Sequence, residues 1–222
     1  MEKFEVRGIF EKTGRARFIS HLDLVRTMQR AMKRSKIPVW YTQGFNPRIY
    51  LNFPLALSLG VESSVEIMDF EIVEKVPFEK MCDDINRVLP EGIRFLSMST
   101  PVCRNKEVAF AEYAMDFYAE GMNGADIGAA LDRVLQQDRI EFEKHSKSKG
   151  IILVDIKPHI DIRSRNDSGD SLYLELRLPA GMDLNLNSTI FTDAFSKYSG
   201  IDFKKVSIKR TKIMKKDGTD FA

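Results

Sequence analysis

The hydrophobic pattern near the start of the chain changes its period at Ser20, and this change restricts the fold more than any other feature of the sequence. In residues 3–10, apolar residues alternate with Glu5 and Arg7, which is typical of a strand with one buried face. In residues 20–36, apolar residues recur at the spacing of one helix face. The apolar helix positions are Leu22, Val25, Met28 and Met32. The opening of the chain therefore predicts a strand followed by an amphipathic helix.

Local signals mark both ends of this helix. Ser20 and Asp23 form an S-x-x-D pattern, in which each side chain can accept a hydrogen bond from a backbone N–H of the first turn. Pro38 cannot continue a helix and restricts the residue before it, so we expect the helix to end at about Lys36.

The same two periods predict the remaining elements. Strands are expected at residues 39–42, from residue 49 onward, at 65–73, at 93–98, at 108–118, several between 140 and 178, and one at 203–213. Helices are expected at residues 77–88, 125–135 and 188–198. NDSGD, residues 166–170, is typical of a hairpin turn. The first half has the order βαββαβ, and the second half repeats it loosely. The sequence therefore predicts the α+β class, with two tandem ferredoxin-like lobes built on antiparallel sheets.

The boundary between the lobes is expected where PVCRNK, residues 101–106, interrupts the pattern. We place the N-terminal lobe at residues 1–102 and the C-terminal lobe at residues 103–222. A chain of 222 residues with 43% hydrophobic content can bury a core in either one large domain or two small ones.

Composition argues against several classes of protein. The longest nearly apolar run, residues 53–61, is much shorter than the roughly 20 residues that span a bilayer, so we expect a cytoplasmic protein without membrane contact. Cys82 and Cys103 lie far apart and have no C-x-x-C partner, which does not favour a disulfide framework or a metal site. We expect no metal and no cofactor in this chain.

Charge is distributed unevenly although the formal net charge is only +2. Residues 1–50 contain eleven Lys and Arg against four Asp and Glu, whereas residues 51–134 contain seven against fifteen. This asymmetry favours a basic face that binds an anion, although a merely solvated surface has the same composition.

Basic residues follow one side of the predicted first helix. Arg26, Arg30 and Arg34 recur every four residues, with Lys33 alongside. Like charges at this spacing repel by a few tenths of a kcal/mol per pair, a cost that bound phosphates or carboxylates would offset. A solvated helix face is the alternative interpretation. The predicted anion-binding set is Lys12, Arg15, Arg17, Arg26, Arg30, Lys33, Arg34 and Arg48, with Phe45 as an aromatic member.

Aromatic residues surround the stretch GFNPR, residues 44–48. Such rings either fill a core or stack on unpaired bases, a contact worth about 1–3 kcal/mol per base. We expect Trp40 and Phe53 in the core, and Phe45 at the loop tip as the stacking candidate. GFNPR is thus predicted to be a turn that also forms the rim of a site.

His21 is a weak catalytic candidate. It falls in the first turn of the predicted helix, where a neutral imidazole could act as a general base. A capping or packed histidine is the alternative, because the sequence shows no nucleophile or acid to accompany it. His145 and His159 are assigned no role.

One long stretch resembles a known family. It comprises GRARFISHLDLVRTMQRAMKRSKIPVWYTQGFNPR, residues 14–48, followed by PLALSLGVES, residues 54–63. This stretch resembles the radical-SAM-linked protein family, whose members are encoded beside, or fused to, cobalamin-binding-domain radical SAM proteins. The chain departs from the family pattern at Ile49 and Tyr50, which stand in place of a Pro-Lys pair.

The resemblance implies a radical SAM enzyme as partner, carrying S-adenosylmethionine and an iron–sulfur cluster. This chain has no three-cysteine cluster motif, so an accessory role follows. The leading prediction is an RNA-binding accessory protein that presents an RNA substrate to that enzyme. The alternatives are a metal-independent endoribonuclease that uses His21, and a protein adaptor that docks the partner without RNA.

Overall fold

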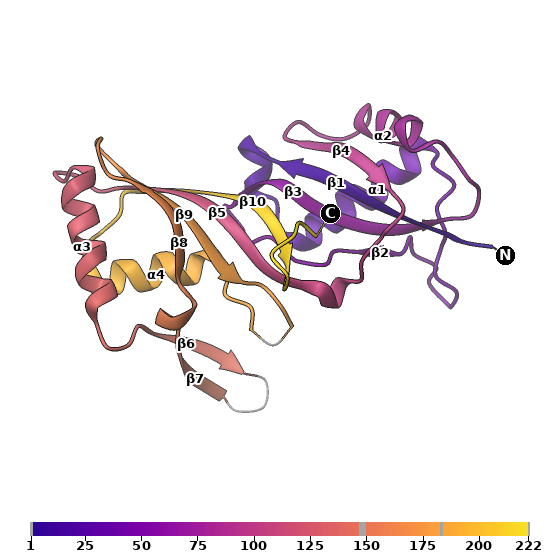
Figure 1. Ribbon diagram of the computed structural model, residues 1–222. Coiled ribbons are helices and arrows are strands. Elements are labelled where there is room, and N and C mark those ends of the chain that lie inside the picture. Colours follow the sequence, from indigo (N-terminus) through magenta and orange to yellow (C-terminus); the bar gives the residue numbers. More distant parts are fainter. Residues whose placement is uncertain (1, 147–149, 183, 222) are drawn as a thin grey trace. The chain divides into compact units, whose positions relative to one another are not determined.

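The computed structural model describes residues 2–146, 150–182 and 184–221. These residues form a mixed α+β protein with four α-helices and mostly antiparallel strand pairing (Figure 1). The chain divides into two compact units. Unit 1 comprises Met1–Ala109 and Arg210–Ala222, and unit 2 comprises Phe110–Lys209.

Unit 1 begins with a strand, a helix and two further strands, as the sequence predicts. Its elements are β1 (Phe4–Lys12), η1 (Gly14–Phe18), α1 (His21–Ser35), β2 (Leu51–Asn52), β3 (Glu62–Ile72), α2 (Phe78–Asn86), β4 (Ile93–Ser99) and η2 (Asn105–Glu107). The antiparallel strand order is β4-β1-β3, and β2 pairs with the outer side of β3. The predicted helix and strand positions in this half are therefore confirmed, except around residues 39–52.

The core of unit 1 lies between one face of β1, β3 and β4 and the two helices. Val6 and Phe10 of β1 belong to one buried cluster with Leu24 and Met28 of α1 and Met81 of α2. Burial of such side chains stabilises by about 1.5–3 kcal/mol each. Alternation along β1 thus determines which face receives the helices.

Helix α1 has the predicted ends. The Ser20 hydroxyl accepts a hydrogen bond from the Asp23 backbone N–H at 3.2 Å, and Lys36 ends the helix in the left-handed conformation at φ 57°. The predicted apolar face is partly wrong, because Leu22 is 68% exposed. The buried positions are Leu24, Met28, Ala31 and Met32, which form a stripe rotated toward the sheet.

Residues 39–42 do not form the strand that the sequence predicts. Val39 and Tyr41 make only isolated bridges, to Ile72 and Ile49. Pro38 precedes this segment and Pro47 follows it, and neither residue can donate a ladder hydrogen bond. The segment consequently reaches β3 only through single contacts such as the Trp40 N–H to Glu71 carbonyl bond of 2.8 Å.

Unit 2 contains most of the second set of predicted elements. This set comprises β5 (Val108–Tyr118), α3 (Gly124–Gln136), β6 (Glu141–Ser146), β7 (Gly150–Asp155), η3 (Lys157–His159), β8 (Asp161–Asn166), β9 (Leu172–Pro179), α4 (Ser188–Ser199) and β10 (Lys205–Lys215). The start of β5 and the end of β10 belong to unit 1. The strand order is β10-β5-β9-β8, and β6 and β7 form a separate hairpin. The hairpin turn predicted at residues 166–170 joins β8 to β9. The rings of Phe117, Phe195 and Phe203 pack against one another edge to face or tilted, with Phe203 half-buried at the margin of the core of this unit.

Strands β5 and β10 carry the chain out of unit 1 and back into it. The compact units therefore place residues 103–109 and 210–222 with the N-terminal part of the chain. Compact units and independently folding domains are different properties, so the boundary at residue 102 stays a prediction. Within the described part of the chain, none of the helices has the length and apolar character needed to cross a bilayer.

Candidate functional site

Helix α1 displays a row of cations on its outer side. Arg26, Arg30, Lys33 and Arg34, here called the basic row, are all exposed. They are held outward because the opposite side of α1 is anchored in the core by Leu24, Met28 and Met32. The structure therefore brings together four of the eight predicted cations on one element.

Two members of the basic row have defined partners. Arg26 forms an exposed ion pair with Asp23 at 3.1 Å, and Arg34 donates from Nη2 to the Val88 carbonyl at 2.7 Å. The Ser20 hydroxyl, followed by the Arg26 guanidinium, lowers the pKa of the Asp23 carboxyl. Within the described residues, Arg30, Lys33 and Arg34 form no ion pair with a carboxylate. Most of the charge of the row is thus available to a ligand.

The GFNPR loop stands beside this helix. Its base is joined to α1 by a hydrogen bond of 3.3 Å from Gln29 Nε2 to the Ile49 carbonyl. The Lys33 ammonium lies 5.9 Å from the centre of the Tyr41 ring. Phe45 at the tip is fully exposed, at 105% of its reference surface, and Arg48 is exposed as well. An apolar ring in water is a plausible stacking surface by its chemistry alone.

The aromatic side chains that were expected in the core are only half-buried. Phe53 packs against Phe10 and against His21, at ring-centre distances of 6.3 and 5.2 Å. Trp40 packs on Tyr50 and carries the Lys3 ammonium 3.8 Å above its ring. Both rings thus cover the edge of the core.

The other predicted cations lie outside α1, and three of them, Lys12, Arg15 and Arg17, lie on β1 and η1. Arg17 forms an ion pair with Glu62 at 3.5 Å, and Arg15 lies in a hollow beside Glu91 and Gly92. Lys12 is 1% exposed and donates to the carbonyls of Arg17 and Ile19. Burial lowers the pKa of the Lys12 ammonium, and the charge of Glu66 opposes this effect. Lys12 thus supports the loop before α1 from inside and has no surface to offer a ligand.

His21 is exposed at the first position of α1, with its ring edge against Phe53. Among the described residues it has no hydrogen-bond partner. A general base is normally oriented by a second group, and no such group is in place here. The structure offers no observation that favours His21 as a catalytic residue, and its role stays a prediction.

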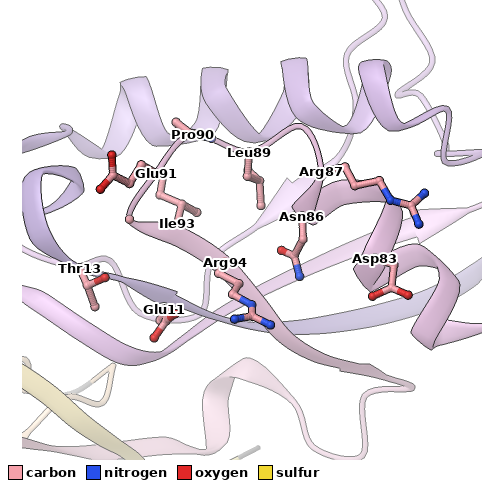
Figure 2. Close-up of a pocket in the computed structure, with 11 residues that line it drawn as sticks. Glu11, Thr13, Asp83, Asn86, Arg87, Leu89, Pro90, Glu91, Ile93 and Arg94 are labelled. Atoms are coloured by element: carbon pink, nitrogen blue, oxygen red, sulfur yellow. The ribbon is translucent and has the colours of Figure 1, made fainter.

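Two hollows of unit 1 differ in the charge of their walls. The larger, about 680 Å³, is lined by the acidic residues Glu11, Asp83 and Glu91 as well as by Arg87 and Arg94. In Figure 2, Glu11 and Arg94 lie side by side on paired strands, so opposite charges meet there. Mixed walls of this kind do not favour an anion.

The smaller hollow, about 340 Å³, lies between α1 and the segment after α2. We call it the α1 hollow, and its lining residues are Thr27, Arg30, Arg34, Val88, Leu89 and Pro90. Among the described residues that line it, the two arginines are the charged ones. Volume favours the larger hollow, but charge favours the α1 hollow as the anion site.

Thr27, Leu89 and Pro90 were not predicted as site residues. Thr27 follows Arg26 on α1 and carries no charge, and the other two residues lie in a loop that is remote in sequence. Leu89 and Pro90 come close to Arg30 because the α2–β4 loop packs against α1, whereas Thr27 is near Arg30 because both lie on α1. Only the turn at Pro90 and Gly92 has a sequence signal.

The fold and this surface define a mixed α+β protein with a basic helix on one unit. The chain belongs to the family described as "Uncharacterized protein conserved in bacteria (DUF2344)", which matches residues 5–188. No curated protein matches the chain. The family match does not show the radical SAM association that the sequence resemblance implies.

Two of the solved structures that are similar to the chain cover most of it. One is the crystal structure of a Cbf5-Nop10-Gar1 complex, with 11% identity, a TM-score of 0.43, and coverage of 95% of this chain and 50% of that chain. The other is the crystal structure of an unknown protein from Galdieria sulphuraria, with 11% identity, a TM-score of 0.30, and coverage of 94% and 99%. The present chain thus spans half the length of the first. Both TM-scores are too low to support an argument about fold or function.

Proposed function

We propose that this protein is a non-catalytic accessory protein that binds RNA through the basic row and the GFNPR loop. The observation that carries the proposal is the row of four outward cations on α1, of which only Arg26 forms an ion pair with a carboxylate within the described residues. Phosphate contacts supply most of the affinity of nucleic-acid binding, and guanidinium groups suit phosphate oxygens.

The exposed Phe45 favours RNA with unpaired bases over a generic polyanion. A fully exposed ring loses little on stacking and gains the contact with a base. Arg48 lies on the same loop and is exposed, and the Lys33 ammonium lies 5.9 Å from the Tyr41 ring at the base of that loop. An acidic protein surface would use the cations but would leave the ring without a role, so the adaptor alternative explains fewer observations.

The partner and the architecture belong to the same proposal. We propose a radical SAM enzyme as the partner that modifies the RNA, with its S-adenosylmethionine and iron–sulfur cluster, on the basis of the sequence resemblance. We also propose that the two units are tandem ferredoxin-like lobes. The strand orders β4-β1-β3-β2 and β10-β5-β9-β8, each with two helices, support this assignment.

The test compares binding of a labelled single-stranded RNA by the native protein and by Arg26→Ala/Arg30→Ala/Arg34→Ala. We expect the variant to bind the RNA roughly tenfold or more weakly. The plot of the logarithm of the association constant against the logarithm of salt concentration should become less steep by about 2, because up to three phosphate contacts are lost. A second variant, Arg26→Ala/Arg30→Ala/Lys33→Ala, keeps the Arg34–Val88 hydrogen bond and separates binding from helix anchoring.

The matched control removes three exposed cations of unit 2, in Arg133→Ala/Arg139→Ala/Lys204→Ala. It changes the net charge equally and leaves the basic row intact. Equal loss of binding in the control would assign the effect to total charge and reject the surface. Weak, salt-insensitive binding by the native protein would reject RNA as the ligand.

A further inference from the structure

The α1 hollow has two chemically different walls. Arg30 and Arg34 form the charged wall, one helical turn apart on α1, where side chains four residues apart are neighbours. Leu89 and Pro90 form the apolar wall, and Thr27 lines the hollow from α1, three positions before Arg30. A ligand that fits both walls must have an anionic end and an apolar or flat end.

The charged wall is held in place by the loop that it faces. Arg34 Nη2 donates to the Val88 carbonyl at 2.7 Å, which joins the two walls directly. This bond uses one edge of the guanidinium and leaves the remaining N–H groups for a ligand. Arg30 forms no ion pair among the described residues, so a phosphate there would not have to displace a carboxylate.

The loop that forms the apolar wall is itself tightly positioned. The Thr13 N–H donates to the Gly92 carbonyl at 2.8 Å, and the Leu89 N–H donates to the Ile85 carbonyl at 3.2 Å. Leu89 packs on the core of unit 1. The hollow is therefore preformed, which lowers the entropy cost of binding.

We infer that the α1 hollow binds a single nucleotide unit, with its phosphate on Arg30 and Arg34 and its base against Leu89 and Pro90. This inference rests on the proposed RNA-binding function and specifies one subsite of it. A volume of about 340 Å³ lies at the small end of ligand pockets, which suits one nucleotide and excludes a duplex. The Thr27 hydroxyl can donate to a phosphate or ribose oxygen.

The probe is adenosine 5′-monophosphate, titrated against the full chain and followed by NMR of the Thr27 and Leu89 methyl groups and the Arg30 side chain. We expect all three signals to shift with one dissociation constant. Adenosine and inorganic phosphate, each carrying half of the chemistry, are expected to bind at least tenfold more weakly. Inorganic phosphate that binds as tightly as the nucleotide would overturn the assignment of the apolar wall.

The variant is Thr27→Glu, which introduces a carboxylate beside the two arginines without breaking the Arg34–Val88 bond. Glutamate is a good helix former, so α1 is retained. We expect binding of both the mononucleotide and the RNA to fall at least tenfold. The control, Val102→Glu, adds the same charge at a position that is 93% exposed and outside the hollow, and it is expected to bind like the native protein.

The outcomes distinguish the subsite from the function on which it rests. RNA binding that persists in Thr27→Glu at the level of Val102→Glu would overturn the subsite and leave the proposed function standing. Mononucleotide binding in the hollow without RNA binding would overturn the proposed function and retain the nucleotide site. Absence of both would overturn both.

Discussion

In unit 1, cationic side chains that point inward have a different role from those that point outward. The buried pair of Glu66 and Arg210 shows the inward role. Each is 2% exposed, and Arg210 Nη1 donates to Glu66 Oε1 at 2.8 Å. Arg210 also donates to the carbonyls of Leu55 and Ala56, just as Lys12 donates to those of Arg17 and Ile19. These inward cations hold loops from inside, whereas Arg30, Lys33 and Arg34 of α1 are exposed and form no ion pair with a carboxylate among the described residues.

At the residue scale, Glu66→Ala is expected to destabilise the protein by about 3–5 kcal/mol, because Arg210 would lose this ion pair and Lys12 the nearby negative charge while both cations stay buried. Urea unfolding measures the loss. Arg26→Ala, which removes an exposed pair with Asp23, is the control and should cost far less, because solvent screens that pair. Equal effects of the two substitutions would contradict the stabilising role of the buried cluster.

At the scale of elements, the α2–β4 loop positions one wall of the α1 hollow. Gly92 has φ +84°, and a Cβ atom there would lie 2.4 Å from the Thr13 carbonyl oxygen. Gly218 has nearly the same φ, +82°, but has open space around the corresponding position. Alanine substitutions at the two glycines therefore share the same backbone strain, and only the substitution at Gly92 adds a steric clash.

Gly92→Ala is expected to lower the free energy of unfolding by about 1–3 kcal/mol more than Gly218→Ala, because only the former forces the loop away from Thr13 and Ala16. Chemical denaturation of both variants gives the difference. The same displacement should weaken mononucleotide binding in the α1 hollow. If Gly92→Ala lowers the free energy of unfolding no more than Gly218→Ala does, the loop can move without destabilising the protein, and the prediction is wrong.

At the scale of the whole molecule, the chain completes unit 1 only with its last segment. Residues 210–222 belong to unit 1, where Phe221 is 1% exposed and its ring lies 4.5 Å from the Arg7 guanidinium. The Cys103 thiol donates to the Phe221 carbonyl at 2.8 Å. Unit 1 therefore depends on residues that are more than a hundred positions apart.

A fragment of residues 1–109 is consequently expected to lack a cooperative unfolding transition, since Glu66 loses Arg210 and Arg7 loses the Phe221 ring. Circular dichroism during urea titration tests this, with the full chain as reference. Co-expression with residues 110–222 is expected to restore the transition. A cooperative transition in residues 1–102 alone would instead support the predicted domain boundary.

Much of the fold could be predicted because its signals are local. The strand at Phe4–Lys12, the Ser20 cap and the end of α1 at Lys36 each depend on neighbours within a few residues. The segment at residues 39–42 was not predictable, because an apolar stretch becomes a strand only where a partner offers a continuous ladder. The prediction that Leu22 is buried was wrong because helical spacing gives the period of the apolar residues but not which side of the helix faces the sheet.

The sequence by itself determined the α+β class, the order of the elements and the basic row, because hydrophobic period, caps and charge are properties of adjacent residues. Only the tertiary structure decided which cations point inward and which outward, as Lys12 and Arg30 show. It also placed Leu89 and Pro90 beside α1 to make a two-walled hollow. The physical reason is that burial and proximity depend on long-range packing, which no local pattern encodes.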